Sequence, residues 1–242
     1  MEQPNNKRIR RTRAELEADV FEAIRKLASE KGLAQITFTD ITQRADIQMS
    51  VLLNNYKNIE RVLDKYAYVS DYWLHDLFDD EHPTDKADRE ILINTLKTLT
   101  AYLYNNTDMQ HLLVWELEAD NPTTRRTARS REKYYKLAIE EYKRLFEGTG
   151  IPIDVIMGLL TAGIYYLILH RKRSTFCGVD YQRKENRERL YQALDCLCNL
   201  IFSALKEHSQ TIEIARKFKE KGISEEVIAE CTGLSVEIVK GL

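Results

Sequence analysis

The apolar residues of this sequence recur three and four positions apart, over long stretches that few glycines or prolines interrupt. Only 9 glycines and 4 prolines occur in 242 residues, which leaves few positions for tight turns. The first clear stripe comprises Leu16, Val20, Ile24, Leu27 and Ala28, which lie on one face of a helix with 3.6 residues per turn. Alternating patterns typical of strands never exceed a few residues. The sequence therefore predicts an all-α protein.

Composition and charge narrow the classes of protein to which the chain can belong. Hydrophobic residues make up 43% of the chain and charged residues 31%, which excludes disordered and collagen-like chains. The 36 basic and 38 acidic side chains give a net charge of −2, so only the distribution of charge can indicate a nucleic-acid partner.

Three further features favour a cytoplasmic protein that does not span a membrane. The N-terminus lacks the apolar segment of a signal peptide. The longest uncharged run, Val155–Leu169, has 15 residues, fewer than a bilayer-spanning helix needs. The cysteines are irregularly placed, which indicates free thiols in a reducing compartment; they are Cys177, Cys196, Cys198 and Cys231.

Short elements follow the first helical stripe. Gly32 is placed to end the first helix. Thr39 is placed to N-cap a helix over Asp40–Ala45, a break falls at Asp46-Ile47, and a second short helix is expected from about Gln48 to Asn54. A long helix capped by Asn58 comes next. Short helices that close on a long one are typical of a helix-turn-helix.

The side chains of this region divide into a core and an outward face. The spacing buries Ile41, Ala45, Ile47, Leu52 and Tyr56. It leaves Gln48, Met49, Ser50, Asn54 and Asn55 outside, where glutamine can pair with adenine and methionine can contact a thymine methyl. Lys57 is placed to meet a phosphate. The preceding arm adds a net charge of +4 over residues 1–13, from Lys7, Arg8, Arg10, Arg11 and Arg13 against Glu2.

This region resembles the tetracycline-repressor (TetR) family of bacterial regulators. The matching residues, within about residues 12–70, are Phe38-Thr39-Asp40-Ile41, Arg44-Ala45, Ile47, Leu52, Tyr56-Lys57 and Glu60 to Leu63. The resemblance implies that Thr39 and Lys57 contact phosphates, and we expect the same of Arg10, Arg11 and Arg13. It also implies a DNA-facing surface made by Gln48, Met49, Ser50, Leu53, Asn54 and Asn55.

The sequence departs from the family pattern at two places. Asp46 stands where the turn usually has glycine; aspartate tolerates a left-handed conformation but places a negative charge close to DNA. Leu53-Asn54-Asn55 replaces the usual aromatic-aromatic-histidine run. An alternative therefore stays open, in which the three-helix subdomain no longer binds DNA.

Further helices are expected over about 85–105, 107–119, 122–147, 152–172 and 184–207. The aromatic residues of this region are mostly expected in the core, and some would line a pocket for an unknown small-molecule effector. His111 and Trp115 share a helix face because they are four residues apart. With Tyr165 and Tyr166 they are the predicted pocket residues.

Two of these helices carry the predicted dimer interface. Val155–Leu169 is apolar almost all round, and residues 184–207 contain an a/d-type seam. Pairing with a second copy would give a four-helix bundle with two-fold symmetry; the alternative is a larger monomeric core. The predicted interface comprises Leu159, Gly163, Leu190, Leu194, Leu197, Ile201 and Leu205.

The last segment, residues 209–242, also looks like a helix-turn-helix. Residues 207–242 carry five basic and seven acidic side chains, which disfavours contact with phosphates. We expect an appendage that packs on the chain or binds a partner, rather than a second DNA reader.

The sequence contains no familiar catalytic motif, and no two of its five histidines have metal-ligand spacing. We therefore expect no enzyme activity, metal or cofactor.

The predicted domains are residues 1–57 (arm and helix-turn-helix), 58–208 (ligand binding and dimerisation, with 58–81 as connecting helix) and 209–242 (appendage). The predicted function is a homodimeric regulator that represses from a palindromic double-stranded DNA operator until a ligand releases it. The alternative is a helical ligand-binding or scaffolding protein that has lost DNA recognition.

Overall fold

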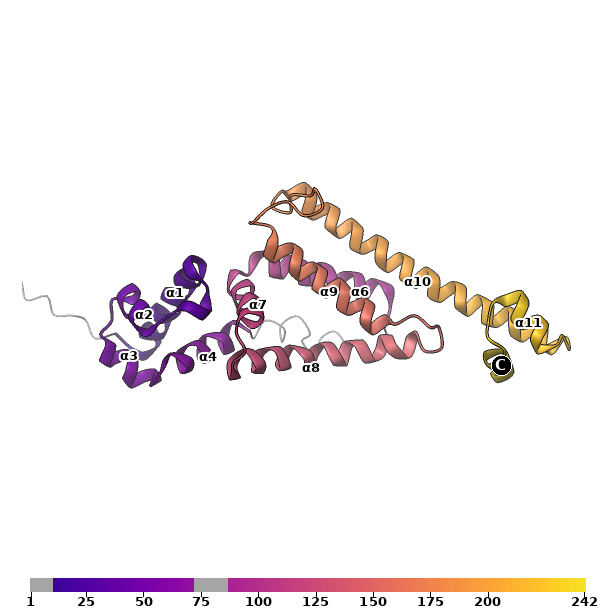
Figure 1. Ribbon diagram of the computed structural model, residues 1–242, viewed down its shortest axis with the longest axis horizontal. Coiled ribbons are helices and arrows are strands. Elements are labelled where there is room, and N and C mark those ends of the chain that lie inside the picture. Colours follow the sequence, from indigo (N-terminus) through magenta and orange to yellow (C-terminus); the bar gives the residue numbers. More distant parts are fainter. Residues whose placement is uncertain (1–10, 72–86) are drawn as a thin grey trace, which may run out of the picture. The chain divides into compact units, whose positions relative to one another are not determined.

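A computed structural model describes residues 11–71 and 87–242. The secondary structure of these residues is helical apart from one isolated β-bridge, Phe176 to Val179, so the all-α prediction is confirmed (Figure 1). The elements are α1 (Arg13–Lys31), the 3-10 helix η1 (Leu33–Gln35), α2 (Phe38–Ala45), α3 (Met49–Tyr56), α4 (Ile59–Ser70), α6 (Arg89–Asn105), α7 (Thr107–Glu118), α8 (Pro122–Leu145), α9 (Ile153–His170), α10 (Lys184–Glu220), α11 (Glu225–Thr232) and α12 (Val236–Gly241).

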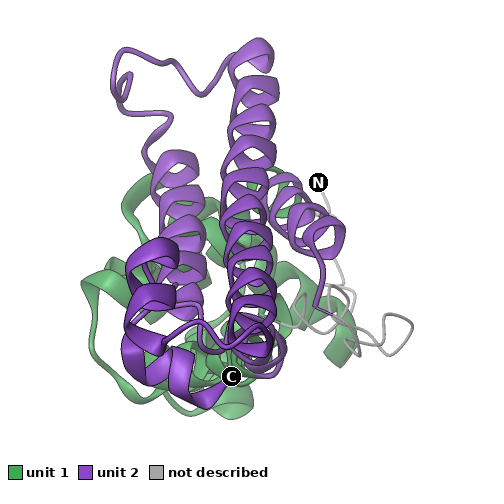
Figure 2. Cartoon of the chain, turned by 90° about the vertical axis from the view of Figure 1, so that its right-hand side faces the viewer, with its two compact units in different colours: residues 1–82, 102–136 green, residues 83–101, 137–242 purple. Residues whose placement is uncertain are grey.

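The chain divides into two compact units, coloured separately in Figure 2. The N-terminal unit comprises residues 1–82 and 102–136, and the C-terminal unit comprises residues 83–101 and 137–242. Helices α6 and α8 each contribute residues to both units. Each unit joins two segments that are separate in the sequence. The three domains expected from the sequence stay a prediction.

The N-terminal unit is built on the apolar stripe of α1. All five residues of the predicted stripe are buried, which confirms the helical periodicity. Phe21 of α1 meets the buried Tyr66 of α4 edge to face, with ring centroids 5.6 Å apart. This contact fixes the connecting helix against α1. The predicted continuation of the connecting helix to residue 81 lies outside the described residues.

Capping groups decide where the first helices begin and end. Thr12 and Glu15 form a capping box at the start of α1, and Gly32 ends that helix at φ 81°, as expected. Helix α2 begins two residues earlier than predicted, because Thr37 rather than Thr39 is its N-cap. The hydroxyl of Thr37 accepts from the Asp40 backbone N–H, and the Asp40 carboxylate accepts from the Thr37 N–H. Asp40 therefore selects the cap, since it lies three residues after Thr37.

The C-terminal unit contains α9, α10 and parts of α6 and α8. Its buried residues include Leu92, Phe146, Ile164, Leu194 and Cys198. Helix α10 has 37 residues and continues beyond the predicted end at residue 207 into the segment 209–242 that was expected as a separate appendage. The segment Glu207-His208-Ser209-Gln210-Thr211 contains no glycine or proline that would end a helix.

The last two helices fold back on the end of α10. A small cluster forms there around Ala215 of α10, Ile228 of α11 and Val239 of α12, all with 0% exposure. Phe218 and Leu234 pack against it. Lys219 donates hydrogen bonds to the carbonyls of Val239 and Lys240 at 3.0 and 2.9 Å, which hold the C-terminal end of α12. The appendage therefore has a small core of its own.

Candidate nucleic-acid interface

The turn between α2 and α3 sets the direction of the candidate recognition helix α3. Asp46 adopts the left-handed conformation, with φ 48° and ψ 56°, so the expectation that aspartate can replace glycine here is confirmed. The Asp46 backbone N–H donates to the Thr42 carbonyl, and the Ile47 N–H donates to the same carbonyl at 3.0 Å. The turn is closed by its own backbone.

Helix α3 packs on the unit with one face and exposes the other. Leu52 is fully buried and Tyr56 is 8% exposed, as predicted, while Ala45 and Ile47 at the turn are half-buried. The predicted DNA-facing residues are all exposed; they are Gln48, Met49, Ser50, Leu53, Asn54 and Asn55. Gln48 is the N-cap of α3 without a side-chain capping bond, so its amide is available to a ligand. The Asn55 amide donates to the Val51 carbonyl at 2.8 Å.

The two predicted phosphate contacts are exposed at opposite ends of the motif. Thr39 lies in the first turn of α2, where backbone N–H groups and the helix dipole favour an anion. Lys57 follows α3 with φ 64°, and its backbone N–H donates to the Leu53 carbonyl at 2.9 Å. Its side chain makes no ion pair with a described residue. Its charge is therefore not neutralised within the described part of the chain.

The arm arginines differ from one another. Arg11 donates to the carbonyls of Ala45 and Asp46, at 3.1 and 3.3 Å, and forms an ion pair with Asp19 at 3.1 Å. It therefore braces the turn before α3, a role that the sequence did not predict. No local pattern could have revealed it, because the partners are 34 and 35 residues away. Arg13 is exposed, and Arg10 lies outside the described residues.

Other cations of the motif are paired within it. Arg44 donates to both carboxylate oxygens of Glu30, each at 2.7 Å. Lys31 lies 2.6 Å from the Asp40 carboxylate, and this contact together with hydrogen bonds from Thr37 lowers the pKa of Asp40 to about 2. These pairs reduce the charge that the motif can offer to phosphates.

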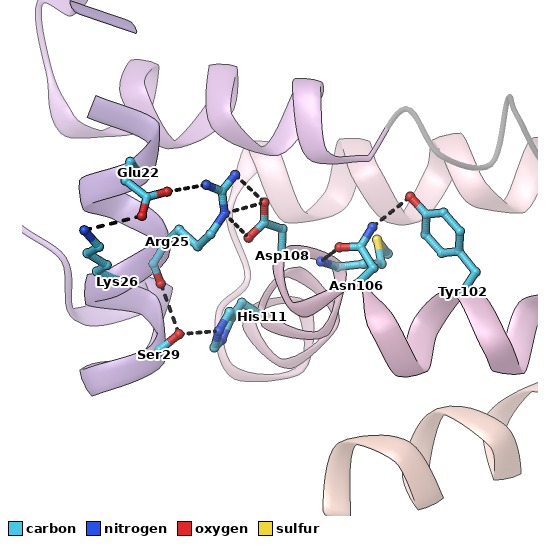
Figure 3. Close-up of polar contacts among 9 residues, drawn as sticks. Glu22, Arg25, Lys26, Ser29, Tyr102, Asn106, Asp108 and His111 are labelled. Atoms are coloured by element: carbon cyan, nitrogen blue, oxygen red, sulfur yellow. Dashed lines mark hydrogen bonds and ion pairs between the residues drawn. The ribbon is translucent and has the colours of Figure 1, made fainter. Parts of the chain in front are cut away.

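Helix α7 is joined to α1 by polar contacts within the N-terminal unit (Figure 3). Arg25 of α1 donates from Nε and Nη2 to the two carboxylate oxygens of Asp108, both at 2.8 Å. These bonds raise the pKa of Arg25. Glu22 accepts from its third nitrogen, Nη1, at 2.6 Å. Bidentate arginine–carboxylate pairs fix orientation as well as distance, so α7 and α1 are held in register.

A second contact repeats this link one turn further along. The Ser29 hydroxyl lies 3.2 Å from Nε2 of His111 and donates to the Arg25 carbonyl at 3.1 Å. The serine oxygen can therefore accept a hydrogen bond from His111 Nε2. Asn106 caps α7, accepting from the Met109 N–H and donating to the Tyr102 hydroxyl at 2.7 Å.

A buried charge network lies deeper in the same unit. Arg131 of α8 donates to Asp71 at 2.8 Å and contacts Glu116 of α7. The side chains of Arg131, Asp71 and Glu116 are 5, 7 and 12% exposed. Burial raises the pKa of Asp71 to about 6, and the nearby Glu116 adds to the rise against the opposing effect of Arg131. One guanidinium serves two carboxylates, so a proton on Asp71 would make the triad neutral.

The four predicted pocket residues fall in different units. His111 and Trp115 belong to α7 of the N-terminal unit, where Trp115 is 6% exposed. Tyr165 and Tyr166 belong to α9 of the C-terminal unit. Tyr166 is stacked on His170, with ring centroids 5.3 Å apart, and meets Phe176 edge to face. The pocket stays a prediction.

The predicted dimer residues show which faces of α9 and α10 are uncovered. Leu159 is 68% exposed and Leu197 is 43% exposed, whereas Leu194 is 3% exposed and belongs to the core of its own unit. Gly163 is exposed, and Leu190, Ile201 and Leu205 are half-buried. The uncovered face of α10 also includes Leu200, which is 61% exposed and lines a groove of about 440 Å³.

Helix α9 is also long and apolar enough to resemble a membrane-spanning helix. Among the described residues it alone has the length and composition to cross a membrane, with a mean hydropathy of 1.7, and 17% of it is buried. The small residues Gly158, Ala162 and Gly163 lie on its exposed side. The helix therefore presents a wide apolar face that its own unit does not cover.

The chain is similar to known proteins in structure and not in sequence. The sequence matches no protein-family profile and no curated protein. The structure is similar to Salmonella enterica GusR, with a TM-score of 0.50 and 13% identity over 78% of this chain and 98% of that one. A TetR-family transcriptional regulator from Pectobacterium atrosepticum gives a TM-score of 0.46 and 16% identity, over 81% of this chain and 97% of that one. At such identities the likeness concerns architecture, and the chain has the fold of Salmonella enterica GusR.

Proposed function

We propose that the chain is a DNA-binding transcriptional regulator that reads its operator with α3. The observation that carries this proposal is the exposed N-terminal end of α3, where Gln48, Met49 and Ser50 present an amide, a thioether and a hydroxyl to solvent. Recognition helices contact base edges with their N-terminal residues. The Asp46 turn and the Arg11 brace hold that end in place.

Base reading and phosphate positioning fall to different residues in this proposal. Gln48 would pair with adenine through its amide, and Met49, which is 38% exposed, would contact a thymine methyl. Thr39 and Lys57 would contact phosphates, as would Arg13 from the arm. Phosphate contacts fix register and carry most of the salt dependence, whereas the base contacts select sequence.

The active form in this proposal is a homodimer on a palindromic operator. The support is the uncovered apolar surface of α9 and α10, where Leu159, Leu197 and Leu200 are 68, 43 and 61% exposed. Exposed apolar patches often mark protein interfaces. Polar groups of Gln192, Asn199 and Ser203 line the groove beside Leu200. Such a mixed surface suits a protein interface, whereas lipid would leave these groups without partners. A second copy is therefore the partner that we infer. The location that we propose is the cytoplasm, because the proposed role is DNA binding.

Regulation would use the link between α7 and α1. Asp108 and His111 of α7 contact Arg25 and Ser29 of α1. Helix α1 is in turn part of the helix-turn-helix domain. A ligand that prefers a different position of α7 would therefore also favour a different position of α1. Release from DNA by a small molecule gives a repressor, which is the mode of control that we propose. The proposal includes no catalytic step.

A helical ligand-binding or scaffolding protein that has lost DNA recognition remains the second candidate. Two observations favour it: the negative charge of Asp46 beside α3, and the pairing of Arg44 and Lys31 with carboxylates. Both lower the attraction of the motif for phosphates.

The two candidates are separated by selecting bound duplexes from a random-sequence pool with the full chain. A regulator should enrich a palindromic motif, and Gln48→Ala should weaken binding to that motif. Gln35→Ala is the matched control, because Gln35 is exposed in η1 of the same unit and lies outside the reading face. Failure to enrich any sequence with a folded, full-length chain would favour the second candidate.

A further inference from the structure

A groove lies on the N-terminal unit, on helices α4 and α8 rather than on the candidate recognition helix α3. It has a volume of about 640 Å³ and is lined chiefly by Tyr68 of α4 and by Arg125, Arg126, Arg129, Ser130 and Lys133 of α8. These α8 positions are three and four residues apart, so the four cations share one face of the helix. The volume is that of a small-molecule site. None of these residues took part in the DNA interface.

Two of the four cations are paired with other described residues and two are not. Arg125 donates to Asp120 at 2.6 Å, and Arg126 donates to Asp64 of α4 at 2.9 Å. Arg129 and Lys133 are exposed and make no hydrogen bond or ion pair with a described residue. Four residues of helix separate them, a rise of about 6 Å. Within residues 11–71 and 87–242 the groove therefore offers two unpaired positive charges, spaced for neighbouring anionic groups of one ligand.

Tyr68 adds a flat apolar surface beside these charges. Its side chain is 62% exposed, and the Arg126 guanidinium lies 5.7 Å from the ring centroid. Exposed aromatic rings next to cations are the elements with which proteins hold nucleobases and their phosphates, because bases stack on the ring while the cations meet the charge.

We propose that this groove binds a nucleotide, with a diphosphate at Arg129 and Lys133 and the base against Tyr68. A concave site of this volume suits a small ligand, and binding of a duplex backbone to the cations of α8 is an outcome that the test separates from it. The inference does not depend on DNA binding by α3, so either can fail without the other.

The test is isothermal titration of the full chain with ADP, adenosine and pyrophosphate. Adenosine diphosphate should bind, and the double variant Arg129→Ala with Lys133→Ala should weaken it about tenfold or more. Lys136→Ala is the matched control, because Lys136 is an exposed lysine of the same helix that pairs with no residue the structure describes and does not line the groove. Tyr68→Ala should weaken ADP and leave pyrophosphate unchanged, while Tyr68→Phe should retain ADP. Adenosine should bind much more weakly than ADP.

Several results would overturn the proposal. One is the absence of ADP binding to the wild-type chain at millimolar concentration. Another is an equal loss in Lys136→Ala, which would mean diffuse attraction to α8. Equal binding of ADP and pyrophosphate, unaffected by Tyr68→Ala, would refute the role of the base. If the double variant loses duplex DNA instead and ADP never binds, the groove is a DNA contact. Thermal melting of each variant checks that these exposed substitutions leave the fold intact.

Discussion

The buried triad of Arg131, Asp71 and Glu116 predicts that stability falls as pH rises through the weakly acidic range. The pKa of Asp71 is raised from 3.8 to about 6, so between these values the folded chain holds a proton that the unfolded chain releases. A group whose pKa is higher in the folded chain than in the unfolded chain stabilises the fold fully at pH values below its unfolded-state pKa. This stabilisation is lost as pH rises through the folded-state pKa. The difference corresponds to about 3 kcal/mol, since one pKa unit is worth about 1.4 kcal/mol.

The experiment measures the urea unfolding free energy of the wild type and of Asp71→Asn from about pH 4 to pH 7. Asparagine keeps the size of the side chain and its hydrogen bond from Arg131 but cannot ionise. The wild type should therefore lose up to about 3 kcal/mol relative to the variant as pH rises. Asp120→Asn is the control, because Asp120 is exposed and Arg125 lowers its pKa. Any effect of Asp120 on the unfolding free energy should therefore change with pH in the opposite direction. A constant difference between wild type and Asp71→Asn would refute the reasoning.

Other predictions concern DNA binding and assembly. Gln48→Ala should cost about 1–3 kcal/mol on the selected operator with little change on random DNA, and equal losses on both would mean that α3 is misplaced. Lys57→Ala should weaken binding to both and lower the salt slope by about one unit per half-site; an unchanged slope would contradict a phosphate contact. Leu159→Glu with Leu200→Glu should give folded monomers in light scattering, and a wild-type monomer at micromolar concentration would contradict the dimer. Deleting residues 222–242 should leave DNA affinity unchanged, and a large loss in a folded dimer would refute the view of the tail as an appendage.

The candidate interface was largely predictable because its signals are local. The spacing of Leu52 and Tyr56 fixed which face of α3 is buried, and the opposite face followed from helix geometry. Asp46 was recognised as a turn residue because few side chains tolerate a positive φ. Thr39 was assigned as the cap in error, since two threonines compete there and only the reciprocal bonds with Asp40 decide between them.

Tertiary structure alone decided the contacts between distant residues. Arg25 and Asp108 are 83 residues apart, and Arg131 reaches Asp71 over 60 residues, so no periodicity could pair them. Leu194 illustrates the same limit within one helix: the heptad pattern marks it as apolar, but packing decides that it faces its own unit while Leu200 stays exposed.

The sequence by itself determined the helical fold, the turn before α3 and the residues that α3 exposes. These depend on backbone geometry and on apolar spacing within one or two turns, which every stretch of sequence carries with it. The tertiary structure decided which charges are neutralised and which surfaces stay uncovered. Those properties depend on distances between helices, and a charge in the sequence acquires its partner, its burial and its pKa only when the chain has packed.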